Sequence, residues 1–145
     1  MDAIAMLEKD HKGAKKVLEE IAKSTGAKRK TLFTALKGEL EAHDRLEEEV
    51  FYPAVQANPK AAGFALQDKQ AHVAVEAALA KLASLPVDDL SWTPTFNAMK
   101  QQLLKHVADE ETNIFVKIRK LLSTTELTAL GEKMKTEKER QLHAV

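Results

Sequence analysis

The sequence predicts an all-α protein, an up-down-up-down four-helix bundle with a short C-terminal fifth helix. Only five of the 145 residues are glycine and four are proline, so few positions interrupt a helix. Apolar residues recur three and four positions apart in four long segments, the spacing of one helical face. Short connections require neighbouring helices to run antiparallel. We expect one domain over residues 1–145, with the bundle at about 2–122 and the last helix at about 124–140.

The first two helices are expected at about Asp2–Ser24 and Lys28–Tyr52. His11 fills the one gap in the apolar stripe of the first helix, whereas lysines and glutamates form its solvated face. In the second helix the inward face turns polar at His43. Pro53 lacks the N–H group that a helix interior needs, so it should end or kink this helix.

The third and fourth helices are expected at about 59–84 and Pro94–Leu122. Asn58 precedes a proline, as at a capped helix start, and Thr93 is the equivalent cap before the fourth helix. Trp92, from the connection between the two helices, is expected to close that end of the bundle.

A fifth helix should follow Ser123, because Ser123 and Glu126 have the spacing of a capping box. Its apolar contacts are expected to be Leu127, Leu130 and Met134. Beyond Lys135 the charge density is high, so we expect the helix to be short.

Four of the five histidines lie inside the apolar stripes of four successive helices, near the middle of each. A single histidine in such a stripe is more often an ordinary core residue, and a purely structural bundle is the competing interpretation. Three of these histidines, however, precede a glutamate by four residues, which puts both side chains on one helical face. The candidate metal ligands are His11, His43, Glu47, His72, Glu76, His106 and Glu110.

Imidazoles and carboxylates directed into one core need a cation, because each unpaired buried ion is costly. Cysteine is absent, so any metal must be bound by nitrogen and oxygen. Such mixed donors suit iron, manganese or zinc better than calcium or magnesium. Since six or more ligands would crowd one ion, we expect two ions, bridged by Glu47 and Glu110.

The order of these residues resembles the haemerythrin-like family, the HHE cation-binding domains, over residues 2–122. The resemblance rests on His11, His43-x-x-x-Glu47-Glu48, Phe51-Tyr52-Pro53, His72 and His106-x-x-x-Glu110-Glu111. It implies a four-helix bundle that holds a non-haem di-iron centre, bridged by carboxylates and solvent, with manganese or zinc as weaker alternatives. By matching position it assigns one iron to His11 and His43, the other to His72 and His106, and the bridges to Glu47 and Glu110.

Two departures from the family pattern bear on function. Oxygen-carrying haemerythrins have a histidine at the position of Glu76 and space the last carboxylate differently. A carboxylate ligand there would stabilise ferric iron and lower the reduction potential, which argues against reversible oxygen carriage. The proline of the second motif is replaced by Val116, so the fourth helix should continue unbroken.

Other polar residues near the motifs are weaker candidates. Tyr52 is a candidate proton or hydrogen-bond donor, although packing at the bundle end is the simpler role. Glu48, Glu49 and Glu111 are expected on the surface or as outer partners of the ligands. His143 lies in the charged tail and should be exposed.

Composition argues against several classes of partner. The 22 basic and 22 acidic residues cancel, so no basic field attracts nucleic acid or anionic lipid. There is no signal-peptide pattern and no run of about 18 apolar residues. We therefore expect a cytoplasmic protein without nucleic-acid or membrane partners, and the sequence identifies no protein partner.

For function, the first hypothesis is a di-iron protein that binds or senses oxygen, peroxide or nitric oxide. The alternative is a di-iron oxidoreductase that detoxifies peroxide or nitric oxide, and iron storage or simple iron binding is a third option. The sequence places no obvious proton-delivery group apart from Tyr52 and the outer carboxylates, which favours binding over catalysis. Whether the protein is an enzyme stays open.

Overall fold

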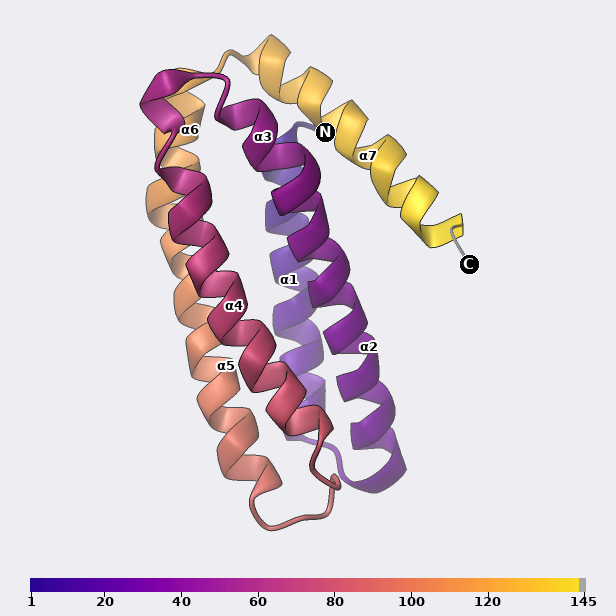
Figure 1. The fold of residues 1–145 in the computed structure, drawn as a ribbon. Helices are drawn as coiled ribbons and strands as arrows, with labels where there is room; N and C mark the ends of the chain where they lie inside the picture. The colour runs from indigo at the N-terminus through magenta and orange to yellow at the C-terminus, as the bar shows by residue number, and fades with distance from the viewer. Residues whose placement is uncertain (144–145) are drawn as a thin grey trace.

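The computed structural model describes residues 1–143 and has helices but no strand in that range. The bundle consists of α1 (Ala3–Ala22), α2 (Gly26–Leu46), α4 (Phe64–Ala83) and α5 (Trp92–Asp109). These helices run alternately up and down (Figure 1), and contacts of α2 with α4 and of α1 with α5 close the bundle. The predicted all-α bundle is confirmed.

Two of the long helices continue past a π-helical turn. After α2 come the π turn η1 (Glu47–Phe51) and α3 (Tyr52–Val55), and after α5 come the π turn η3 (Glu110–Ile114) and α6 (Phe115–Leu121). The fourth helix thus continues through Val116 as predicted, but the π turn was not foreseen. Pro53 sits in the first turn of α3, where its missing N–H is tolerated.

Helix starts differ from the predictions at three places. Gly26 has a φ of 58°, a left-handed conformation that suits glycine, and α2 begins there rather than at Lys28. Thr93 is not a cap, because α5 already begins at Trp92. Asn58 does act as a cap, since its side chain accepts a hydrogen bond from the Lys60 N–H at 3.0 Å. The helix that it caps is the short 3₁₀ turn η2 (Pro59–Ala61), and α4 starts only at Phe64.

The fifth helix, α7 (Thr124–His143), is longer than predicted. It has 20 residues, as many as α1, and it packs outside the bundle against α1 and α2 (Figure 1). The capping box is present: the Glu126 N–H donates to Ser123 Oγ at 3.1 Å, and the Ser123 N–H donates to Glu126 Oε1 at 3.0 Å. Leu127, Leu130 and Met134 are buried as expected.

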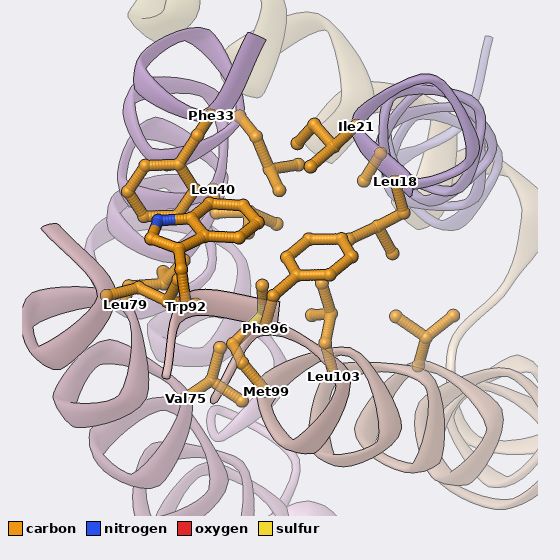
Figure 2. Close-up of a cluster of buried hydrophobic side chains, with 14 residues drawn as sticks. Leu18, Ile21, Phe33, Leu40, Val75, Leu79, Trp92, Phe96, Met99 and Leu103 are labelled. Atoms are coloured by element: carbon orange, nitrogen blue, oxygen red, sulfur yellow. The ribbon is translucent and has the colours of Figure 1, made fainter. Parts of the chain in front are cut away.

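Two separate apolar clusters fill the bundle. The first lies at the end where α4 connects to α5 (Figure 2). There Trp92 stacks on Phe96 with ring centroids 5.2 Å apart, which confirms its predicted role in closing this end. The second cluster includes Ile4, Phe51 and Phe115 and is covered by α7. The buried histidines and glutamates form a polar layer between the clusters: His43 and Glu47 lie between Leu40 of the first cluster and Phe51 of the second along α2 and η1.

Within residues 1–143, no helix is both long enough and apolar enough to span a lipid bilayer.

Candidate metal centre

Four buried or nearly buried histidines, one from each bundle helix, meet in two pairs. The rings of His11 on α1 and His43 on α2 have centroids 5.0 Å apart. The rings of His72 on α4 and His106 on α5 have centroids 5.2 Å apart. The apolar stripes predicted from the sequence therefore place all four imidazoles in one region of the bundle.

Two fully buried glutamates connect the histidine pairs. Glu110 Oε1 lies 3.2 Å from the Nε2 atoms of both His11 and His106. The two oxygens of Glu47 diverge. Its Oε1 is 2.5 Å from His43 Nε2, and its Oε2 is 3.9 Å from His72 Nε2. Each glutamate thus faces one histidine of each pair, which is the position a bridging ligand requires.

Both glutamates are the first residues of π turns, Glu47 of η1 and Glu110 of η3. π turns inside α-helices are rare and occur frequently at functional sites. Each turn widens the helix at the height of the polar layer. The following glutamates, Glu48 and Glu111, contact the Nδ1 atoms of His72 and His11, whereas Glu47 and Glu110 face the Nε2 atoms of the same two rings.

The inward atoms of this cluster are close together but are not hydrogen-bonded. Among residues 1–143, no hydrogen-bond partner is found for buried atoms of His11 (Nε2), His43 (Nε2), Glu47 (Oε1 and Oε2), Asp68 (Oδ1 and Oδ2), His72 (Nε2) and Glu110 (Oε1). Leaving one such buried group unsatisfied costs about 1–3 kcal/mol. A cation that accepts their lone pairs removes this cost, so the donor set fits a metal.

Two carboxylates that the sequence analysis did not propose as ligands lie in the half of the cluster around His72. Asp68 Oδ2 is 2.9 Å from His72 Nε2, and Asp68 Oδ1 is 3.5 Å from His106 Nε2. Asp44 Oδ1 is 3.4 Å from His72 Nε2. Asp68 precedes His72 by one helical turn, so a search in both directions from each histidine would have found it. Asp44 has no such local signal.

Glu76, which the spacing favoured as a ligand, is exposed and belongs to none of the buried groups with ligand atoms within 4.8 Å of one another. Those groups are His11–His43–Glu47–Glu110, Asp68–His72–His106 and Asp44–Glu47–His72. Glu76 and Asp68 both lie one turn from His72, but on opposite sides. The structure directs Asp68 rather than Glu76 into the core.

Outer carboxylates hold three of the histidines by their second ring nitrogen. His11 Nδ1 is 2.8 Å from Glu111 Oε2, and His72 Nδ1 is 3.2 Å from Glu48 Oε1. His43 Nδ1 is 2.9 Å from Asp10 Oδ2. An Nδ1–H that donates to a carboxylate leaves Nε2 free to bind a metal. Glu48 and Glu111 were predicted as surface or outer residues, whereas Asp10 was missed.

Tyr52 is buried beside the cluster. Its hydroxyl donates to Glu110 Oε2 at 3.5 Å, and its ring packs edge-on against Phe51 with centroids 5.0 Å apart. Tyr52 therefore has both roles proposed from the sequence: it donates a hydrogen bond, and its ring packs at the bundle end. Burial and the charge of Glu47 raise the pKa of Tyr52, so the hydroxyl keeps its proton at neutral pH.

Crowding of charge shifts the pKa values of the metal-free site. Burial lowers the pKa of His72, but the adjacent carboxylates of Asp68 and Asp44 outweigh burial and raise the pKa to about 10. Burial and the charge of Glu110 raise the pKa of Glu47. Burial, with a contribution from Glu76, raises the pKa of Asp44 to about 7. Without a cation, the cluster must therefore hold protons.

A buried set of histidines and carboxylates drawn from all four helices of a bundle defines a metal-binding helical protein. The sequence matches the family described as hemerythrin HHE cation binding domain over residues 2–118. The chain belongs to this family.

A similar solved structure is that of a hemerythrin HHE cation binding domain-containing protein from Mycobacterium kansasii. It shares 26% sequence identity with this chain, and the TM-score is 0.83. The match covers 97% of this chain and 86% of the other. A comparison with curated protein sequences gave no match.

Proposed function

We propose that the protein holds two non-haem iron ions and that this centre binds a small ligand such as oxygen, peroxide or nitric oxide. The observation that carries the proposal is the placement of Glu47 and Glu110, each of which contacts one histidine of each pair. A single ion would not explain two carboxylates positioned between two imidazole pairs. Iron is favoured over calcium or magnesium because imidazoles make up half or more of the inward donors.

The two ions would have unequal ligand sets. One would be held by His11 and His43, and the other by His72 and His106 together with Asp68. Glu47 and Glu110 would be shared. The extra carboxylate gives the second ion more negative surroundings, which favours the ferric state and opposes reversible oxygen carriage.

Metal content tests the centre. Protein loaded with ferrous iron under anaerobic conditions should contain two ions per chain by elemental analysis. His106→Ala should lose at least one of them, because it removes an inward donor, whereas His143→Ala should retain both, because His143 is exposed. A wild-type protein that retains no iron after gel filtration would contradict the proposal.

A second candidate function, reductive consumption of peroxide or nitric oxide, is favoured by Tyr52. Its protonated hydroxyl lies next to Glu110, within the layer where the ligand would bind, and such chemistry needs a proton donor. From the sequence, Tyr52 was a candidate donor with packing as its simpler role. Its position beside Glu110 supports the enzymatic alternative.

Exposure of the reduced, iron-loaded protein to each ligand separates the two functions. A binding protein should give a lasting change in visible absorption with one ligand, whereas an enzyme should consume many equivalents of it. Tyr52→Phe should slow consumption while keeping two irons, because it removes only the hydroxyl. Equal consumption by Tyr52→Phe would show that the hydroxyl is not the donor.

A further inference from the structure

The outer face of α4 carries an exposed apolar stripe. Leu66 and Val73 are 64% and 58% exposed, and they lie about two helical turns apart on the same face. Ala77 and Ala80 are exposed beside them. Exposed apolar side chains that gather on one surface mark an interaction site, whereas single scattered ones need no explanation.

The solvated face of α1 differs clearly from this surface. Both helices have 20 residues. The exposed charged residues of α1 are Lys9, Lys12, Lys15, Lys16, Glu19 and Glu20, and those of α4 are Lys69, Glu76 and Lys81. Figure 1 shows α4 open along its outer side, whereas α7 packs against α1 and α2. The apolar stripe of α4 is therefore left without a cover by the part of the chain that the structure describes.

This face is complementary to itself when a second α4 runs antiparallel to it. A two-fold axis at Val73 brings residues opposite each other when they lie at equal distances before and after Val73. Leu66 then faces Ala80 of the second copy, so a large side chain meets a small one. Val73 faces its own equivalent at the axis, and by symmetry each of the other contacts forms twice.

The charges on the same face match in this arrangement. Lys69 lies four residues before Val73 and Glu76 lies three residues after it. At roughly 100° per residue, both lie on the same side of the apolar stripe, so Lys69 of each copy faces Glu76 of the other. Within residues 1–143 neither side chain forms an ion pair with an opposite charge, so both charges are available to a second copy.

We propose that the outer face of α4 is the interface of a symmetric homodimer, in which two α4 helices pack antiparallel about Val73. Exposed ion pairs add little affinity, so Leu66 and Val73 supply most of the binding, whereas Lys69 and Glu76 fix the register. A partner of different sequence would not require a face that is complementary to itself. Contact between single helices lies at the small end of protein interfaces, so the dimer should be reversible.

Sedimentation velocity over a range of protein concentrations tests the dimer. The wild-type mass should rise from that of one 16.1 kDa chain towards twice that value. Val73→Lys should keep the protein monomeric, because it brings two positive charges together at the axis, and its fold should survive because Val73 is exposed. Leu142→Lys on α7 is the matched control, another exposed apolar residue, and it should dimerise like the wild type.

Charge exchange tests the register. Lys69→Glu and Glu76→Lys should each weaken association at least about tenfold, because each places like charges opposite one another twice in the dimer. The double variant Lys69→Glu/Glu76→Lys should recover most of the lost affinity, because the ion pairs form again with their signs exchanged. Lys16→Glu, at an exposed lysine of α1, should have no effect. Circular dichroism checks that every variant is folded.

Each contrary result would overturn the proposal. A wild-type chain that remains monomeric at the highest concentration would exclude the dimer. Unchanged dimerisation of Val73→Lys would place the interface on another face. A double variant that associates no better than the two single variants would show that Lys69 and Glu76 do not face each other, which excludes the antiparallel arrangement.

Discussion

Three of the buried histidines are held at both ring nitrogens, by a carboxylate outside and by the candidate centre inside. For His43 the outer carboxylate is Asp10, whose other oxygen Oδ1 accepts a hydrogen bond from Lys138 Nζ at 3.3 Å. The charge on the outer carboxylate makes Nε2 a stronger donor and fixes the ring orientation. A residue that never touches the metal therefore influences its affinity.

The first prediction concerns Asp10. Asp10→Ala should weaken metal binding about 10- to 100-fold, the range seen when outer partners of metal-bound histidines are removed. Glu19→Ala, an exposed acidic residue on the same helix, should leave binding unchanged. The measurement is a competition titration against a chelator of known affinity. Equal affinities for the two variants would show that Asp10 does not orient His43.

The second prediction concerns pH and the metal-free protein. The pKa of His72 is raised to about 10 in the folded state from the ordinary value near 6.5. Its contribution to stability is therefore complete below about pH 6.5 and is lost as pH rises through about 10. The melting temperature of chelator-treated protein should fall over this range. His72→Gln should show a shallower fall, and identical slopes would contradict the assignment.

Among the helices, α7 is held by a close approach to the N-terminus. A Cβ atom added at Gly131 would lie 2.4 Å from the carbonyl oxygen of Met1 and 2.9 Å from the carbonyl carbon of Asp2. Only glycine allows these backbones to meet. The contact fixes α7 beside α1, at the height where Lys138 reaches Asp10.

The third prediction tests this contact. Gly131→Ala should destabilise the fold by about 1–3 kcal/mol, the usual cost of overpacking. Gly38→Ala in α2 is the matched control, because a Cβ there meets nothing within 4 Å, and it should stabilise by about 0.4–1 kcal/mol. Denaturant unfolding measures both. A stabilised Gly131→Ala protein would show that α7 is not packed in this way.

For the molecule as a whole, the polar layer separates two apolar clusters. Such a layer costs stability unless a cation binds it, because removing water from charged groups is unfavourable. Metal binding and folding are therefore expected to be coupled.

The fourth prediction follows from that coupling. Free ferrous iron at 100 times its dissociation constant should add about 2.7 kcal/mol to the unfolding free energy, and a chelator should remove it. His106→Leu should lose most of this gain, yet should be as stable as the wild type or more stable without metal. Thermal unfolding with and without iron measures both effects. A purely structural bundle would be stabilised by His106→Leu and would not respond to iron.

The sequence by itself determined the helical class, the number of long helices and the positions of the inward histidines. These are local properties, because the 3.6-residue period places residues such as His43 and Glu47 on one helical face independently of how the other helices pack. The Ser123–Glu126 cap is local in the same way. Predictions of this kind needed only a few consecutive residues.

Only the tertiary structure decided between Asp68 and Glu76. Both lie one turn from His72, so spacing along α4 does not distinguish them. The axial position of α4 relative to Glu47 decides which of the two side chains enters the polar layer. Asp44 and Asp10 are likewise placed by packing between helices, which no local period encodes. Lys138 reaches Asp10 across 128 positions of sequence, because Gly131 lets α7 lie against the start of the chain.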